Sequence, residues 1–174
     1  FPENFIVLCN ATDIYRRSGK VKVSVEISSK IISIHPSQPD GYLRVCQDLK
    51  SLSRFSESIK LAEEGLRKFP NNLEIHCIAI DACLDNNNYK LALHKTKEGL
   101  LHFPKSETLM MSAIRVFRHT SEYDLMVKLI KDMITDPYMA QLGFDLIIDL
   151  YIDTWSFDRA LIKTEEYIYR DASC

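Results

Sequence analysis

The stretch FSESIKLAEEGLRKFP at residues 55–70 is followed, 34 residues later, by YKLALHKTKEGLLHFP at residues 89–104. Both stretches begin with an aromatic residue, carry a small residue at their fourth position and end in GLxxFP. Pro36, Pro70 and Pro104 repeat the same interval. A constant spacing of this kind indicates a repeat architecture, in which each repeat is a supersecondary unit that stacks on its neighbours.

A 34-residue frame that begins at Phe5 divides the chain into five blocks without an insertion: 5–38, 39–72, 73–106, 107–140 and 141–174. Repeat position 21 is aliphatic in every block, as Val25, Ile59, Leu93, Val127 and Leu161. In each block, positions 4, 7, 8 and 11 form one mostly apolar stripe, and a second stripe runs from position 17 to position 28. These spacings place each stripe on one face of a helix, and turn-forming residues separate the two stripes. The sequence therefore predicts an all-α fold of antiparallel helix pairs.

The small residues of the pattern resemble those of the tetratricopeptide repeat (TPR) family. Position 20 holds Ser24, Ser58, Ala92 and Ala160, position 27 holds Gly65 and Gly99, and a proline stands near position 32. The resemblance covers essentially the whole chain. It implies a right-handed superhelical solenoid, with residues 1–174 forming one array.

Blocks four and five depart from this pattern. Block four has Met126 and Met133 at the small positions, so we expect its second helix to pack differently. Block five has Tyr167 at position 27, and no polar capping helix follows it, although solenoids normally need one. We expect the end of the array to be covered by a missing downstream region or by a second copy of the chain. The residues for such a homodimer through the C-terminal repeat are Tyr151, Leu161 and Ile168.

Composition and charge narrow the choice of partners. The formal net charge of −2 gives no electrostatic reason to expect nucleic acid or an anionic membrane. No apolar stretch is long enough for a membrane-spanning helix, so we expect no membrane insertion. The five cysteines include no CxxC pair, which indicates reduced thiols and a cytoplasmic protein. The chain begins with Phe1 rather than Met, which indicates a shortened or processed chain, so the lack of a targeting signal carries no weight.

Residues suited to catalysis are not gathered into a recognisable motif. None of the five histidines forms a pair at metal-binding spacing, and His76 stands in an apolar stripe, where we expect a packed core side chain with its hydrogen bonds made. No phosphate-binding glycine loop or nucleophile elbow is present. We therefore expect no enzymatic activity, no cofactor and no metal.

In a TPR array the first helix of each repeat lines a concave groove, so the resemblance implies that positions 2, 5, 6, 9, 12 and 13 face a ligand. The residues singled out at these positions are Asn10, Asp13, Arg17, Arg44, Gln47, Lys50, Glu74, Ile78, Asp81, Ser112, Arg115, Arg118, Asp145 and Asp149. Their charge changes sign from block to block, which favours a protein or peptide of mixed charge. The alternative is that these charges only keep the surface soluble.

The resulting hypothesis is a non-enzymatic scaffold that binds a protein or peptide in its concave groove. Two alternatives remain open, namely a regulatory or substrate-docking arm of a larger enzyme such as a transferase, and a self-association module. Pentatricopeptide RNA-binding repeats have a similar length, but the small residues, the prolines and the near-neutral charge favour the TPR pattern and no nucleic acid.

Overall fold

The computed structural model describes the backbone of residues 3–171, and the side chains in that range except those of residues 157 and 167–171. Within this part of the chain all regular structure is helical. The helices are α1 (Phe5–Arg17), α2 (Val21–Ile34), α3 (Asp40–Ser51), α4 (Phe55–Lys68), α5 (Leu73–Asp85), α6 (Tyr89–His102), α7 (Glu107–His119), α8 (Tyr123–Thr135), α9 (Ala140–Asp153) and α10 (Phe157–Asp171). Each block contributes two helices, which confirms the helical reading of the sequence.

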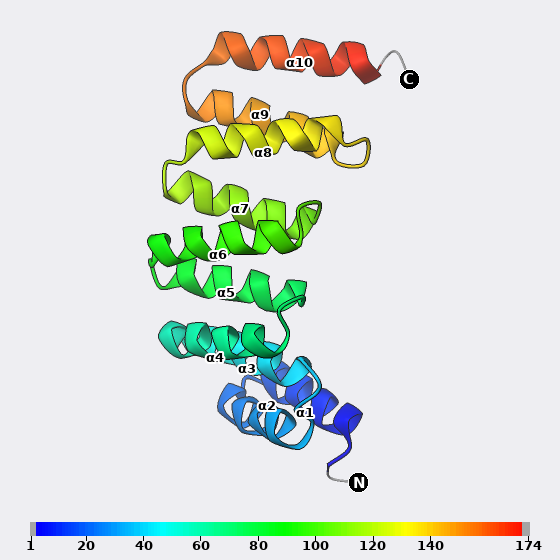
Figure 1. Cartoon of the computed structure of the whole chain (residues 1–174), viewed down its shortest axis with the longest axis vertical. Coiled ribbons are helices and arrows are strands. Elements are labelled where there is room, and N and C mark those ends of the chain that lie inside the picture. Colours follow the sequence, from blue (N-terminus) through cyan, green and yellow to red (C-terminus); the bar gives the residue numbers. More distant parts are fainter. Residues whose placement is uncertain (1–2, 172–174) are drawn as a thin grey trace. The chain divides into compact units, whose positions relative to one another are not determined.

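Two compact units make up the chain, Phe1–Val116 and Phe117–Cys174, and the boundary between them falls inside α7. In the first unit each helix from α1 to α6 packs on the next, and the first helices α1, α3 and α5 also touch in turn (Figure 1). In the second unit α8 packs on α9, and α9 packs on α10. That the five blocks form a single array stays a prediction.

One recurring turn joins the two helices of every block. The backbone φ at repeat position 15 is positive in each, at Gly19 (76°), Ser53 (57°), Asn87 (55°), Ser121 (58°) and Trp155 (56°). This conformation lets the N–H of the residue itself and that of the next residue bond back to the helix, as in Gly19 to the Arg16 carbonyl (3.0 Å) and Lys20 to the Tyr15 carbonyl (2.9 Å). The pattern is the Schellman ending of a helix. Only the first block uses glycine there, so each of the other turns carries roughly 1–2 kcal/mol of backbone strain.

Neighbouring blocks meet where position 27 of one block faces position 3 of the next. Gly65 faces Ile75, and a Cβ added to this glycine would lie 3.3 Å from the Ile75 side chain. Gly99 faces Leu109, where the corresponding distance is 3.1 Å. A glycine on the second helix therefore makes room for a large aliphatic side chain on the following first helix.

The other two contacts between blocks have these sizes exchanged. Position 27 holds Ile31 or Met133, both fully buried, and position 3 of the following block holds Gly41 or Gly143. A Cβ added to Gly41 would lie 2.9 Å from the Ile32 backbone nitrogen. A Cβ added to Gly143 would lie equally close to the backbone of α8, at 2.9 Å from the Ile134 nitrogen. The bulk of Met133, which the sequence flagged as a departure, is thus matched by a glycine in the next block.

Apolar residues of the stripes form the core of the first unit. One buried cluster contains Ile59, Ile80, Ala82, Cys83, Ala92, Leu109 and Val116. A second contains Tyr42, Cys46, Ala62, Ile75, Ile78 and Ala79. These clusters fix how the first helices are rotated, and so determine which of their residues remain accessible.

The glycine contacts predict different responses to the same substitution. Gly41→Ala should lower the free energy of unfolding by about 1–3 kcal/mol, because its methyl group would overlap the α2 backbone. Gly65→Ala should be close to neutral, because its neighbours lie 3.3 Å away and alanine favours a helix by about 0.5–1 kcal/mol. Urea unfolding monitored by circular dichroism would measure both, and equal losses would contradict the size matching.

Candidate functional site: a groove lined by the first helices

An open groove of about 590 Å³ lies along the first helices of the first unit. Its lining comes from α1, α3, α5 and the first turn of α7, and consists of Arg16, Gln47, Lys50, Ser51, Leu73, Glu74, Cys77, Ile78, Asp81 and Thr108. The first helices of four blocks thus contribute to one continuous hollow, as the resemblance to TPR proteins implied.

Apolar side chains from α5 form part of the groove surface. Ile78 is buried against the core, while Leu73 and Cys77 are half-buried. Burial, followed by the nearby carboxylates of Asp81 and Glu74, raises the pKa of the Cys77 thiol to about 11. The thiol therefore stays neutral at physiological pH, and Cys77 offers the groove a soft, uncharged surface.

Most charges beside this surface are paired with one another. The Lys50 ammonium lies 3.6 Å from Asp81 and 3.2 Å from Asp85. Asp81 also accepts a hydrogen bond from the Arg115 guanidinium. These pairs join α3 to α5 and α5 to α7. Glu74 is exposed and forms no ion pair within the described residues.

A buried polar cluster joins α1, α2 and α3 at one end of the groove. Asp48 is fully buried, and it accepts hydrogen bonds from Arg16 Nε (2.5 Å) and from the Ser24 hydroxyl (2.6 Å). Arg44 Nη1 donates to Asp13 (2.6 Å), to the Thr12 hydroxyl and to a backbone carbonyl of α1. Both arginines therefore hold neighbouring first helices together.

The structure separates the expected groove residues into two sets. Gln47, Lys50, Glu74, Ile78 and Asp81 line the hollow. The remainder of the first-unit set lie outside its lining, namely Asn10 and Arg17, which are exposed, the paired Asp13, Arg44 and Arg115, and the buried Ser112. Their expected contact with a ligand stays a prediction.

In the second unit, Arg118 pairs with Asp153 at 3.4 Å, and Asp145 and Asp149 are exposed on α9. Leu161, expected at a self-association surface, is exposed, and Tyr151 is half-buried. The side chain of Ile168 lies outside the described residues.

Sequence reasoning missed one lining residue and passed over four others. Leu73 stands at repeat position 1, which was not among the expected groove positions. The other four occupy expected repeat positions but were not singled out: Arg16, Ser51, Cys77 and Thr108. Leu73 could have been identified from the sequence, because it directly follows the helix cap Asn72 and is therefore the first residue of α5.

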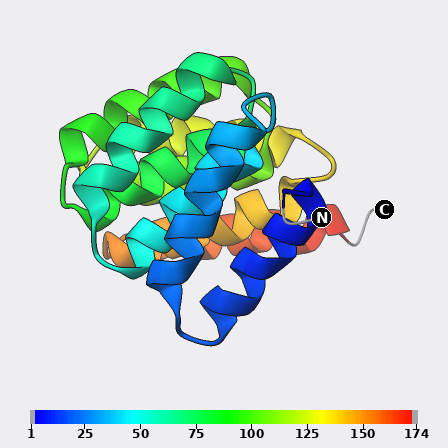
Figure 2. The ribbon, with the colours of Figure 1, turned by 90° about the horizontal axis from the view of Figure 1, so that it is seen from below.

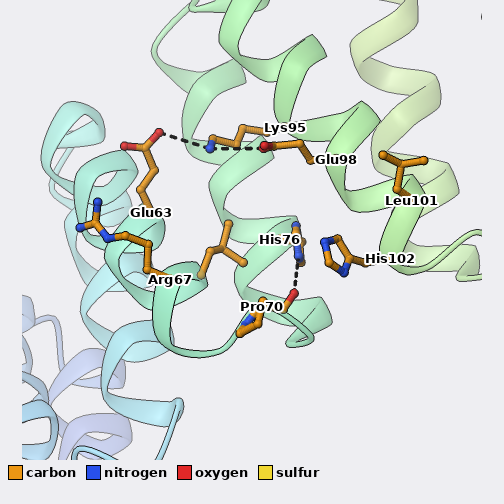
Figure 3. Close-up of a pocket in the computed structure, with 9 residues that line it drawn as sticks. Glu63, Arg67, Pro70, His76, Lys95, Glu98, Leu101 and His102 are labelled. Carbon is orange, nitrogen blue, oxygen red and sulfur yellow. Dashed lines mark hydrogen bonds and ion pairs between the residues drawn. The ribbon is translucent and has the colours of Figure 1, made fainter.

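A second hollow, of about 630 Å³, lies between the second helices α4 and α6, over α5 (Figure 3). Lys95 crosses it, 3.4 Å from both Glu63 and Glu98. His76 is 5% exposed, its Nε2 lies 2.9 Å from the Pro70 carbonyl oxygen, and its Nδ1 has no hydrogen-bond partner in the described structure. The expectation of a packed core histidine is confirmed, but only one of its two nitrogens is satisfied. Burial lowers the pKa of His76 below its ordinary value.

Comparisons with known proteins bear on the fold. No family model matches the chain. A tetratricopeptide repeat protein from Parabacteroides merdae ATCC 43184 aligns with 95% of this chain and 65% of its own, at a TM-score of 0.69 and 17% identity. MamA from Desulfovibrio magneticus RS-1, from residue 41 to its end, aligns with 96% of this chain and 94% of its own, at a TM-score of 0.70 and 12% identity. The chain has the tetratricopeptide repeat fold.

A similar fold also occurs within a longer protein. A chain in the structure of Naa15/Naa10 bound to HypK-THB aligns with 95% of this chain, which spans 25% of that protein, at a TM-score of 0.69 and 14% identity.

No described helix here is both long and apolar enough to cross a membrane. Among the same residues, no group of three or more His, Cys, Asp or Glu side chains is arranged to hold a metal ion.

The buried cluster at the end of the groove predicts a large stability loss. Asp48→Ala should lower the free energy of unfolding by about 3 kcal/mol, because the substitution leaves the Arg16 guanidinium and the Ser24 hydroxyl without their partner. Asp85→Ala, which removes a half-exposed partner of Lys50, should cost less than about 1 kcal/mol. Chemical denaturation of the two variants would compare them, and equal losses would mean that Asp48 has no special structural role.

Proposed function

We propose that this chain is a non-enzymatic scaffold that binds a peptide or a protein segment in the groove of its first unit. The observation that carries the proposal is the continuous hollow formed by the first helices of four blocks, with Leu73, Cys77 and Ile78 as an apolar surface inside it. An extended segment can lie along such a groove and place an apolar side chain against α5. The fold supports the proposal, because TPR proteins generally mediate contacts between proteins.

The charges of the groove indicate what kind of segment fits. Lys50 and Asp81 are already compensated by neighbours on the adjacent helices, so a ligand gains little from either charge. Glu74 is exposed on α5 and uncompensated within the described residues. We therefore infer a ligand that combines an apolar side chain with a nearby lysine or arginine.

A peptide selection tests the proposal directly. Random 12-residue peptides displayed on phage would be selected against the chain, and the recovered peptides measured by fluorescence anisotropy. Groove-binding peptides should lose affinity by about tenfold, or about 1.4 kcal/mol, when Glu74→Lys reverses the uncompensated charge. They should also slow the labelling of Cys77 by a maleimide, because a bound segment covers that thiol.

The matched control is Glu26→Lys, which makes the same charge change at an exposed site on α2. Peptides that respond equally to both variants would bind by overall charge and not in the groove. A selection that recovers no peptide sensitive to Glu74→Lys would overturn the proposal. Arg44 is a poor probe, because its substitution would also release α3 from α1.

A second candidate function is self-association through the C-terminal repeat. On α10, Leu161 is 63% exposed and Ile162 is 54% exposed, whereas the residues equivalent to Leu161 in the other blocks are at least partly buried. Two neighbouring exposed aliphatic side chains favour a contact with another chain.

Light scattering over a concentration series would test this second candidate. The expected result is a mass that rises with concentration, and Leu161→Glu should abolish the rise by placing a charge in the contact. Tyr138→Ser, which removes an exposed aromatic residue outside α10, should leave the mass unchanged. A monomer at every concentration would rule out this contact.

A further inference from the structure

A buried histidine with one unsatisfied nitrogen lies where α5 and α6 pack side by side (Figure 2). His76 Nε2 lies 2.9 Å from the Pro70 carbonyl oxygen. A carbonyl oxygen can only accept a hydrogen bond, so Nε2 carries the hydrogen and Nδ1 of the neutral ring carries a lone pair. Nδ1 is buried and has no hydrogen-bond partner within the described residues. The site therefore fits the neutral ring.

A proton added to Nδ1 would have no acceptor. The atom faces α6, because a Cβ built on Gly99 would lie 3.6 Å from it. The His102 ring lies beside the His76 ring, with 5.3 Å between their centroids, and His102 Nδ1 lies 3.2 Å from the Asn71 amide oxygen (Figure 3). Protonated His76 would therefore be a buried cation with an unpaired N–H, which costs free energy.

The charged groups around His76 do not compensate such a cation. Those that line the hollow with it are Glu63 and Arg67 from α4 and Lys95, Glu98 and His102 from α6, and α3 contributes none of this lining. Glu63 and Glu98 are each already 3.4 Å from Lys95. Burial is the largest cause that lowers the pKa of His76, and the charges of His102 and Lys95 act in the same direction. The hydrogen bond to Pro70 and the charge of Glu98 oppose them.

His76 also lies between the groove and the contact that orients α7. Its neighbour in sequence, Cys77, lines the groove, while His76 itself faces α6. Gly99, which packs beside Nδ1, also makes room for Leu109, since its added Cβ would lie 3.1 Å from that side chain. Thr108, next to Leu109, lines the groove. A change in the contact between His76 and Gly99 thus acts on two helices that form the groove.

We propose that His76 is an acid-sensitive switch, in which protonation of Nδ1 opens the contact between α5 and α6 at Gly99 and releases the ligand of the groove. The release of a ligand rests on the proposed function, whereas the opening does not. Because the closed contact favours the neutral ring, it has its full strength above the ordinary histidine pKa of about 6.5 and weakens as the pH falls below that value. At pH 5.5 the open population can rise by up to about tenfold.

Hydrogen exchange of α6 tests the opening without any ligand. The Phe103 amide donates to the Gly99 carbonyl (2.9 Å), and mass spectrometry would follow its exchange and that of its α6 neighbours at pH 7.5 and 5.5. Wild type is compared with His76→Met, which introduces the residue found at Met110, the same position in block four, and with the non-titrating His76→Gln. The ratio of wild-type to variant rates cancels the intrinsic effect of pH on exchange. This ratio should rise severalfold on acidification, up to about tenfold.

The matched control is His94→Gln, which removes an exposed histidine from α6 and should exchange like wild type at both pH values. A ratio that is the same at pH 7.5 and 5.5 for both His76 variants would overturn the proposal, whatever any peptide does.

Peptide affinity tests the release. A peptide recovered from the groove selection should bind wild type up to about tenfold more weakly at pH 5.5 than at pH 7.5, and His76→Met equally well at both. The same acid-induced loss of affinity in wild type and His76→Met would overturn the proposed release. If the selection yields no groove peptide, the proposed function fails, while the exchange ratio still decides whether His76 opens the contact.

Discussion

Adjacent repeats of this chain approach each other so closely at one point that there is room for only one large side chain. The contact joins position 27 of a second helix to position 3 of the next first helix, and a glycine stands on one side of each described contact. Gly65 and Gly99 leave room for the following residue, whereas Gly41 and Gly143 leave room for the preceding one. Because interiors are close-packed, a void or an overlap here would shift the whole following helix. The orientation of the first helix that follows each such contact therefore depends on this pairing.

The groove is a consequence of that orientation. Once α1, α3 and α5 lie side by side, their charged residues are close enough to pair across helices, as Arg44 does with Asp13 and Lys50 with Asp81. Asp48 extends this pairing into the interior, because it occupies the position that is apolar in the next two blocks and is satisfied there by Arg16 and Ser24. Arg16 thus contributes both to the interface between blocks and to the lining of the groove.

The repeat, the helix pairs and the first-helix lining could be predicted, because each follows from spacing along the chain. The partner of each side chain could not, since periodicity identifies the face of a helix but not the neighbour across it. Arg44 and Arg115 were placed in the groove by their repeat positions, and nothing in the spacing indicated their carboxylate partners on the adjacent helices. Met133 appeared as a departure from the repeat pattern for a related reason, because its matching glycine stands ten residues later in another block. The sequence placed turn-forming residues between the two helices of a block but did not identify the left-handed residue, since serine and asparagine signal that conformation less clearly than glycine.

Pairing within the groove also bears on how the proposed scaffold would select a ligand. A charge that is already balanced by a neighbour on the protein contributes little to affinity, because a ligand must displace one ion pair to form another. Under the proposed function, selectivity would rest on the apolar side chains of α5 and on the carboxylate of Glu74, which has no ion pair within the described residues. The ion pairs link neighbouring first helices, so the proposed ligand would meet a groove that is already formed, which lowers the cost of ordering it on binding. The charged residues that the sequence placed in the groove are thus, for Lys50 and Asp81, also contacts between neighbouring first helices.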